Sequence, residues 1–363
     1  MVIENKKRKL SLNYLKSILI ILLFSKSYLI DQTDGQIYSK VIMKVLSGSA
    51  RKICNCDEEV RPNEIYLNGQ SQSATSQCTY NIVEGENKVT LVWRRNIMSC
   101  NKMFFYCVSI IEMDFSHFDT SQVTDMAEMF NGCKNLKSLD LSNFNTSLLS
   151  GETMHSMFGD CHALQYINLS SFDTYNQENL GHMFYNCKSL ESLDLSNFKT
   201  NNILYLDNMF YGCENLKMLD LSNFETSKNT NFTTMFYGCT SLTSLDFRNF
   251  DTTSITQNIK FNYIFTNCRN LEFINFNNYK DGALNLNIDH FKDLSNNVVI
   301  CTLNEKLNEE LDKNPDIRNN IAQNWYKYNK KLYDNNKCTD YCASTSSKFE
   351  FKKNVMINVH QTQ

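Results

Sequence analysis

Two motifs recur along this chain at the same intervals, and they constrain the fold more than any other feature. A Met-Phe-x-x-Cys motif starts at Met103, Met129, Met157, Met183, Met209 and Met235, with a weaker copy at Ile264. A Leu-Asp-Leu-Ser-Asn-Phe motif has copies whose first residues are Met113, Leu139, Ile167, Leu193, Leu219, Leu245 and Ile274. By subtraction, both series advance by 26, 28, 26, 26, 26 and 29 residues. A fixed period of about 20 to 50 residues indicates structural repeats that stack on their neighbours.

The first half of each repeat predicts a short strand. Leu136, Leu139 and Leu141 have the L-x-x-L-x-L spacing of leucine-rich repeats. On a strand, Leu139 and Leu141 point to the same side because they are two positions apart. That side must be the core, since Asp140 between them is costly to bury. Phe144 is then expected to turn inward after the strand.

The second half of each repeat predicts a short helix. Thr120 and its counterparts suit a helix start, because a threonine hydroxyl accepts a hydrogen bond from a first-turn N–H. Met126, Met129 and Phe130 follow at the helical spacing i, i+3, i+4. Gly132 is a suitable C-terminal stop. We therefore expect an α/β repeat, with a parallel β-sheet on one face of the stack and short helices on the other.

These motifs carry a family resemblance. The Leu-Asp-Leu-Ser-Asn-Phe-x-Thr-Ser run, followed by Met-Phe-x-x-Cys, resembles the BspA-like leucine-rich-repeat surface proteins. The resemblance covers Met103 to Tyr279, about half of the chain. It implies a right-handed leucine-rich-repeat solenoid on a secreted or surface-displayed protein that serves adhesion or recognition. It implies no catalytic residue, and it names no ligand.

The rest of the chain divides around the repeats. Residues 1–27 have a basic start and a short apolar run, Ser17 to Phe24, which predicts a secretory signal peptide. An uncleaved signal anchor extended to Ile30 is the alternative. Residues 28–98 predict a β-rich N-terminal cap, with strand-like runs at residues 37–46, 64–67, 78–83 and 88–93. Residues 99–280 hold about seven repeats, and residues 281–363 a C-terminal cap with a closing strand at 297–301 and the start of a Cys-rich segment.

The fourteen cysteines form two sets. The repeat set, one per repeat, is expected to consist of buried free thiols, with disulfides between adjacent turns as the alternative. This set is Cys107, Cys133, Cys161, Cys187, Cys213, Cys239 and Cys268. The cap set is expected to contain disulfides, with zinc as the alternative. This set is Cys54, Cys56, Cys78, Cys100, Cys301, Cys338 and Cys342.

Outward strand positions supply the candidate binding face. An acidic row occupies the position between two core residues in each repeat: Asp114, Asp140, Asp194, Asp220 and Asp246, with Asn168 and Asn275 at equivalent places. This row either serves the turn through hydrogen bonds or forms a concave strip that binds a cation such as calcium or a basic partner. The neighbouring outward position varies between repeats, and its largest residues are Tyr166, Met218 and Phe273.

Composition and motifs disfavour nucleic-acid binding, catalysis and metal or cofactor binding. The net charge of −3 over 363 residues does not favour nucleic acid. No H-E-x-x-H, nucleophile elbow or phosphate-binding loop occurs, and His155 and His182 lack further metal ligands in the pattern, so we expect no enzyme, metal or cofactor. Asn145 and Asn231 lie in N-x-[ST] sequons that can carry glycans on expected turns.

We therefore expect a secreted or cell-surface protein that binds a protein or another cell-surface or matrix macromolecule without catalysis. Its contact with a membrane would be limited to an uncleaved anchor. The alternatives are a self-associating coat or wall component and, less favoured, a secreted hydrolase.

Overall fold

The computed structural model describes residues 39–73, 75–85, 87–247, 249–254, 262–276, 294 and 299–301. Contacts between Cα atoms divide the chain into two compact units, residues 37–335 and a second unit of residues 1–36 and 336–363. Every described residue belongs to the first unit. The expected signal peptide lies outside the described residues, as does the expected C-terminal cap apart from residues 294 and 299–301.

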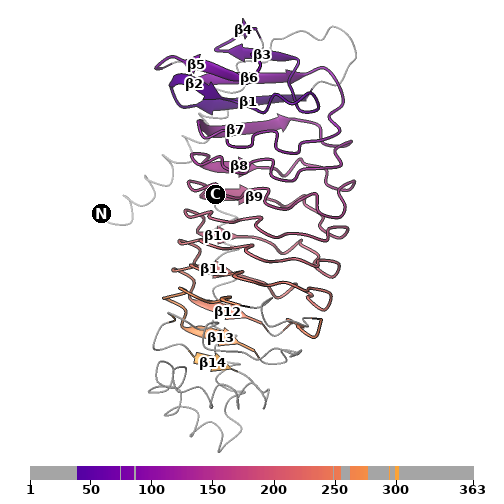
Figure 1. Ribbon diagram of the computed structural model, residues 1–363, viewed down its shortest axis with the longest axis vertical. Coiled ribbons are helices and arrows are strands. Elements are labelled where there is room, and N and C mark those ends of the chain that lie inside the picture. Colours follow the sequence, from indigo (N-terminus) through magenta and orange to yellow (C-terminus); the bar gives the residue numbers. More distant parts are fainter. Residues whose placement is uncertain are drawn as a thin grey trace, which may run out of the picture. The chain divides into compact units, whose positions relative to one another are not determined.

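The described residues form fourteen strands, and the later ones succeed one another layer by layer (Figure 1). The N-terminal strands are β1 (Ser39–Val45), β2 (Gly48–Lys52), β3 (Glu64–Leu67), β4 (Gln70–Gln72), β5 (Thr79–Ile82) and β6 (Lys88–Trp93). The strands from the repeats onward are β7 (Ile110–His117), β8 (Ser138–Asp140), β9 (Tyr166–Asn168), β10 (Ser192–Leu193), β11 (Met218–Leu219), β12 (Ser244–Asp246), β13 (Phe273–Asn275) and β14 (Val299–Cys301).

The N-terminal strands continue directly into the repeats through one mixed sheet. Its strand order is β4-β3-β6-β1-β7-β8-β9. β1 is antiparallel to both β6 and β7, whereas β7, β8 and β9 are parallel to one another. The four strands expected at the N-terminus are confirmed as β1, β3, β5 and β6, while β2 and β4 were not anticipated. The first repeat thus adds its strand to the edge of the cap, so its apolar end is covered.

Parallel strands of consecutive repeats pair in register, but they are divided among three sheets. Leu139 lies opposite Ile167, Leu193 opposite Leu219, and Leu245 opposite Ile274. Each pair joins equivalent positions of consecutive repeats, as the sequence period predicts. Beyond the first sheet, β10 pairs with β11, and β12, β13 and β14 form a third sheet. The closing strand expected near residue 300 is present as β14.

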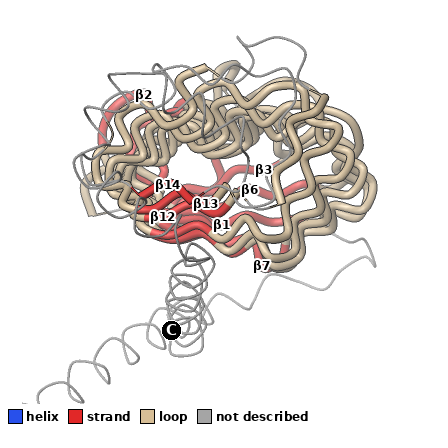
Figure 2. The backbone as a smooth tube through the Cα atoms, turned by 90° about the horizontal axis from the view of Figure 1, so that it is seen from below, coloured by secondary structure: helices blue, strands red, loops and turns tan. Residues whose placement is uncertain are grey.

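The predicted α/β fold class is wrong, because the described part of the chain contains no helix. Each repeat forms one coil, meaning one turn of the chain around the core. Figure 2 shows the strands of the repeats on one side of these coils, with loops and turns around the rest. The segment expected to be helical, which ends near Gly132, consists of turns and of residues without regular secondary structure. The structure therefore has mixed sheets and turns in place of the predicted leucine-rich-repeat solenoid, which would contain helices.

Left-handed residues explain the absence of helices. In every repeat, the residue before the Met position and the residue before the Cys position both have a positive φ. The first set, between 52° and 59°, is Lys102, Glu128, Ser156, His182, Asn208, Thr234 and Tyr263. The second set, between 55° and 78°, is Tyr106, Gly132, Asp160, Asn186, Gly212, Gly238 and Asn267. A right-handed helix needs φ near about −63° throughout, so two left-handed residues four positions apart prevent it.

The backbone hydrogen bonds of this turn run partly between repeats. The N–H groups of Lys102, Phe104 and Tyr106 donate to carbonyl oxygens of the following repeat, at 2.8 to 3.0 Å. The alternate N–H groups of Phe105 and Cys107 instead close turns within their own repeat, at 3.0 Å. A helix would use these donors internally. Here, three of these five donors bond to the next repeat, which satisfies buried polar groups without a helix.

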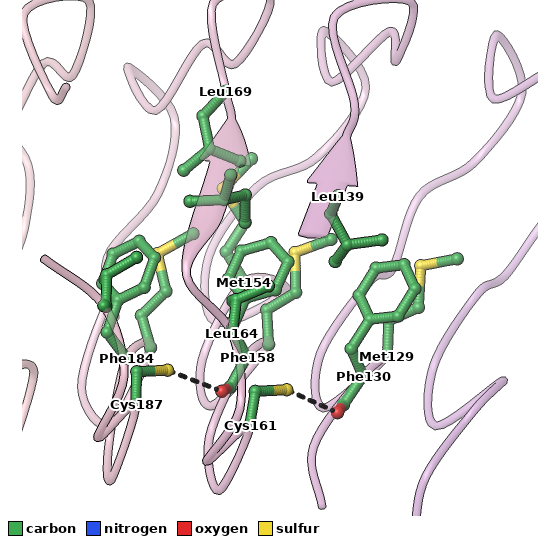
Figure 3. Packing of buried hydrophobic residues seen from close by; sticks show 14 of the residues in the cluster. Met129, Phe130, Leu139, Met154, Phe158, Cys161, Leu164, Leu169, Phe184 and Cys187 are labelled. Atoms are coloured by element: carbon green, nitrogen blue, oxygen red, sulfur yellow. Dashed lines mark hydrogen bonds between the residues drawn. The ribbon is translucent and has the colours of Figure 1, made fainter. Parts of the chain in front are cut away.

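The core is a set of side-chain columns that run through the coils. One column contains stacked phenylalanine rings, with centroids 5.6 to 6.4 Å apart and planes within 14° of parallel: Phe104, Phe130, Phe158, Phe184, Phe210, Phe236 and Phe265. The leucines of the strands and the methionines of the turns pack around it (Figure 3). Offset ring pairs of this kind add about 0.5–1.5 kcal/mol each beyond burial alone.

The repeat cysteines are buried free thiols, as expected, so the alternative of disulfides between adjacent turns is wrong. Each thiol from Cys133 onward donates to a backbone carbonyl of the preceding repeat, at 3.1 to 3.2 Å. Figure 3 shows two of these bonds, from Cys161 to Phe130 and from Cys187 to Phe158. Burial raises the pKa of Cys213 to about 12. These thiols are therefore structural donors rather than reactive groups.

The cap cysteines include one disulfide, between Cys56 and Cys78. This bond confirms the expectation of a disulfide in the N-terminal cap. Cys54 and Cys100 are free and buried. Cys338 and Cys342 lie outside the described residues, and the side chain of Cys301 is not described.

Candidate functional site

The predicted binding residues lie together in two neighbouring columns on the strand-bearing side of the coils. We call this surface the strand face. Its first column is Glu112, Ser138, Tyr166, Ser192, Met218, Ser244 and Phe273, and its second is Asp114, Asp140, Asn168, Asp194, Asp220, Asp246 and Asn275. Asp194 and Asp220 come directly after β10 and β11, whereas the other residues lie within strands. Strand register places Ser138 beside Tyr166 and Asp140 beside Asn168. The structure thus aligns these positions along one side of the repeats, but Asn275 is only 1% exposed and does not contribute to the surface.

The acidic column has a clear structural role in the turns. Each side chain from Asp114 to Asp220 accepts a hydrogen bond from the backbone N–H of the serine two positions later, at 2.9 to 3.1 Å. These bonds confirm the turn role that the sequence allowed. They also explain why Asn168 can replace aspartate, since its side-chain oxygen makes the same bond at 3.1 Å. Whether the column also binds a partner stays a prediction.

The first column carries the variable side chains, and Tyr166 is the most prominent. Its side chain is 40% exposed, whereas the equivalent position in three other repeats holds serine: Ser138, Ser192 and Ser244. Partial burial, and secondarily the neighbouring Asp140 carboxylate, raise the pKa of the Tyr166 phenol. At the N-terminal end of the column, Glu112 lies 3.9 Å from the ammonium group of Lys44.

A buried threonine row, which the sequence suggested would cap helices, instead fastens consecutive coils. Thr120, Thr146, Thr174, Thr200 and Thr226 are each at most 2% exposed. Each hydroxyl donates to a carbonyl oxygen of the next repeat, at 2.8 to 3.4 Å. The same hydroxyl accepts the N–H of that residue, at 2.7 to 2.8 Å. Both polar groups of one residue are therefore satisfied by one side chain.

Asparagines that follow the strands make a second set of links between coils. The amide groups of Asn197 and Asn223 each donate to two carbonyl oxygens of the preceding repeat, at 2.6 to 2.9 Å for the closest pairs. Asn143 makes the equivalent bonds at 2.9 and 3.4 Å. The recurring Asn and Thr side chains thus belong to the scaffold, and the remaining exposed positions are the candidates for function.

A comparison with protein families identifies the repeats. The family described as Mycoplasma protein of unknown function, DUF285, matches residues 98–194 and 179–297. Together these matches cover more than half of the chain. The chain belongs to this family. The match supports a surface-repeat protein family, the coarser part of the resemblance stated from the sequence. No curated protein and no solved structure matches the chain significantly.

The two sequons of this DUF285 chain differ in their surroundings. Asn145 is exposed, and its side-chain oxygen accepts the N–H of Ser147 at 3.0 Å. Asn231 is half-buried in a parallel bridge to Tyr205, rather than in the expected turn. Its side-chain oxygen accepts both the N–H and the hydroxyl of Thr233, at 3.2 and 2.7 Å. Asn145 is therefore the more accessible of the two amides.

Three histidines of the DUF285 repeats, His155, His162 and His182, lie near carboxylates. His155 lies 3.8 Å from Glu128, and His182 lies 3.8 Å from Asp207. Burial lowers the pKa of His182, and the Asp207 carboxylate partly opposes this effect. Within the described ranges, no group of three or more His, Cys, Asp or Glu residues could hold a metal ion. In the same ranges, no apolar helix of membrane-spanning length was found.

A surface cavity of about 620 Å³ spans three consecutive repeats, and the sequence pattern did not predict it. Exposed polar groups of Ser170, Asp173, Ser196, Lys199 and Glu225 line it, together with the ring of Tyr175. The signal was present in the repeats, because Tyr175 stands where other copies have Ser121, Ser147, Asn201 and Ser227. A position-by-position comparison of the DUF285 repeats would therefore have singled out this residue.

Proposed function

We propose that this protein is a non-catalytic, secreted or surface-displayed protein that recognises another macromolecule through the strand face. The proposal includes a relationship to the BspA-like surface proteins, which the repeat motifs resemble. Membership of a surface-repeat family supports the location. The repeated scaffold supports recognition, because stacked repeats present an extended surface on which exposed positions can vary while the core stays constant.

Tyr166 is the observation that carries the proposal. A tyrosine on a short strand can serve as a rigid anchor in a partner's pocket, and aromatic residues dominate the binding energy of many interfaces. The fold does not require this ring, because the same position is serine in Ser138, Ser192 and Ser244. The ring is nevertheless 40% exposed on the strand face.

The acidic column next to Tyr166 indicates the charge of the partner. Asp140 and Asp194 are exposed in this column. Rows of carboxylates attract basic surfaces and steer their encounter. We therefore expect a protein partner with a basic patch beside the pocket that receives Tyr166.

The test compares strand-face variants of the full chain for binding to a panel of enzymatically deglycosylated extracellular-matrix proteins. Tyr166→Ser should weaken binding at least tenfold, as expected for an aromatic anchor worth about 2 kcal/mol. Asp140→Asn and Asp194→Asn should together weaken binding, most strongly at low salt, because asparagine can retain the turn bond seen at Asn168.

Leu148→Ser is the matched control, because Leu148 is 49% exposed and lies outside the strand face. It should leave binding unchanged. Binding that survives Tyr166→Ser and both asparagine changes would refute the strand face as the recognition surface. A wild-type chain that binds only to itself, with a size that grows with concentration, would favour the coat-component alternative.

A further inference from the structure

The cavity lined by Tyr175 lies outside the strand face and combines two departures from the repeat pattern. Tyr175 replaces the small polar residue found at Ser121, Ser147 and Ser227. Lys199 replaces the acidic or amide residue found at Asp119, Asn145, Asp173, Glu225 and Asp251. The two exceptional residues come from consecutive repeats, and both line the same cavity. The repeat pattern itself does not account for either residue.

The local turn does not need the side chain of Tyr175. Its backbone N–H donates to Asp173 at 3.1 Å, just as Ser121 donates to Asp119 at 2.8 Å and Ser147 donates to Asn145 at 3.0 Å. The backbone therefore satisfies the turn whatever side chain follows. The ring of Tyr175 remains 48% exposed. An exposed aromatic ring that the turn does not require is available for a ligand.

The charged groups around this ring are held only weakly. The ammonium group of Lys199 lies 3.5 Å from the Asp173 carboxylate and 5.7 Å from the centre of the Tyr175 ring. Both members of the ion pair are more than half exposed, at 57% and 51%. Exposed ion pairs contribute little to the free energy of folding, so a ligand can displace Lys199 from the ring at a small cost in free energy. The carboxylate and ammonium then remain as hydrogen-bonding groups at the rim.

We propose that this cavity binds a neutral saccharide. The face of Tyr175 would pack against the C–H groups of a sugar ring. Asp173 and Glu225 would accept hydrogen bonds from sugar hydroxyls, and Lys199, Ser170 and Ser196 would donate them. The volume of about 620 Å³ lies within the range of small-molecule sites. This proposal does not rest on protein recognition by the strand face.

The lining disfavours other classes of ligand. Among the described residues that form the cavity none is aliphatic, and Phe172 and Phe198 are only 2% and 1% exposed, so an apolar peptide finds no anchor. The two carboxylates at the rim oppose a strongly anionic ligand. A neutral molecule rich in hydroxyl groups meets neither obstacle.

The experiment screens the full chain on a printed array of neutral and acidic oligosaccharides and measures each neutral hit by calorimetry. The wild type should bind at least one neutral oligosaccharide. Tyr175→Ser should weaken that binding about tenfold or more, the loss expected when an aromatic contact of about 1.4 kcal/mol is removed. Asp173→Asn, which can keep the turn bond as Asn145 does, should also weaken it.

Tyr166→Ser is the matched control, because it makes the same change on the strand face and should leave saccharide binding unaltered. The unfolding midpoint of each variant checks that it folds. The proposal is overturned if no neutral oligosaccharide binds, if only anionic glycans bind, or if the hit survives both Tyr175→Ser and Asp173→Asn. Loss of protein binding by Tyr166→Ser with saccharide binding retained would separate the two proposed sites.

Discussion

At the scale of single residues, the threonine row shows how one hydroxyl links two coils. Thr200 is 2% exposed, and its hydroxyl donates to the carbonyl of Glu225 at 2.9 Å and accepts the N–H of Glu225 at 2.8 Å. Thr200→Val keeps the shape but leaves both backbone groups without this partner. Because each buried unsatisfied group costs about 1–3 kcal/mol, we expect a loss of about 2–4 kcal/mol in the free energy of unfolding, measured with urea.

A matched control for this change is Thr243→Val. The Thr243 hydroxyl makes a longer, exposed bond to the Lys217 carbonyl, at 3.4 Å. Water can replace that bond, so the expected loss is below about 0.5 kcal/mol. Equal losses for the two variants would show that the threonine row does not owe its effect to buried backbone groups.

At the scale of the element, the Met-Phe turn depends on two left-handed residues. Gly132 has φ +78°, and a methyl group added there would lie 2.8 Å from the ring of Tyr106. Gly238 has φ +72°, but its added methyl group would lie 3.7 Å from Gly212, an ordinary contact. We expect Gly238→Ala to cost about 1–2 kcal/mol from backbone strain alone, and Gly132→Ala to cost more, because the ring must also move.

Thermal or urea unfolding of the two alanine variants measures this order. Gly238→Asn provides the control, because asparagine occupies the equivalent left-handed position at Asn186 and Asn267. Asparagine tolerates this conformation, so the change should cost less than Gly238→Ala. A Gly238→Ala variant as stable as the wild type would contradict the assignment of strain to this turn.

At the scale of the whole molecule, the thiol column links stability to alkaline pH. Burial raises the pKa of Cys213 and of Cys268 from 9.0 to about 12. The unfolded thiols lose their protons near pH 9, while the folded thiols keep theirs. The contribution of these thiols to the free energy of unfolding is therefore complete below about pH 9 and is lost as the pH rises toward about 12. The loss is about 1.4 kcal/mol per pH unit for each thiol.

Urea unfolding of the wild type and of Cys213→Ala, from about pH 8 to about pH 10.5, tests this linkage. The variant lacks one titrating thiol, so its deficit relative to the wild type should shrink as the pH rises. Tyrosine and lysine titrations are common to both chains and cancel in the difference. A deficit that stays constant across this range would mean that the Cys213 thiol ionises equally in both states.

Patterns along the chain predict the parts of this protein that recur within each repeat. The common period of the two motifs predicted stacked units, and L-x-x-L-x-L spacing placed the strand leucines in the core, where Leu139, Leu193 and Leu245 lie. Alternation predicted the outward row at Asp140 and Asp194. Burial of the repeat cysteines as free thiols followed from their place in an apolar pattern. Each of these inferences needs only the order and spacing of residues along the chain.

The contacts that join one repeat to the next become evident only in the folded chain. The spacing of Met126, Met129 and Phe130 fits a helix as well as a turn, and the turn forms because its free N–H groups find carbonyls in the adjacent coil. The partner of Thr200 is likewise in the next repeat. The cavity beside Tyr175 is lined in part by Lys199, which belongs to the next repeat. Contacts across a repeat boundary depend on stacking geometry, which local periodicity does not encode.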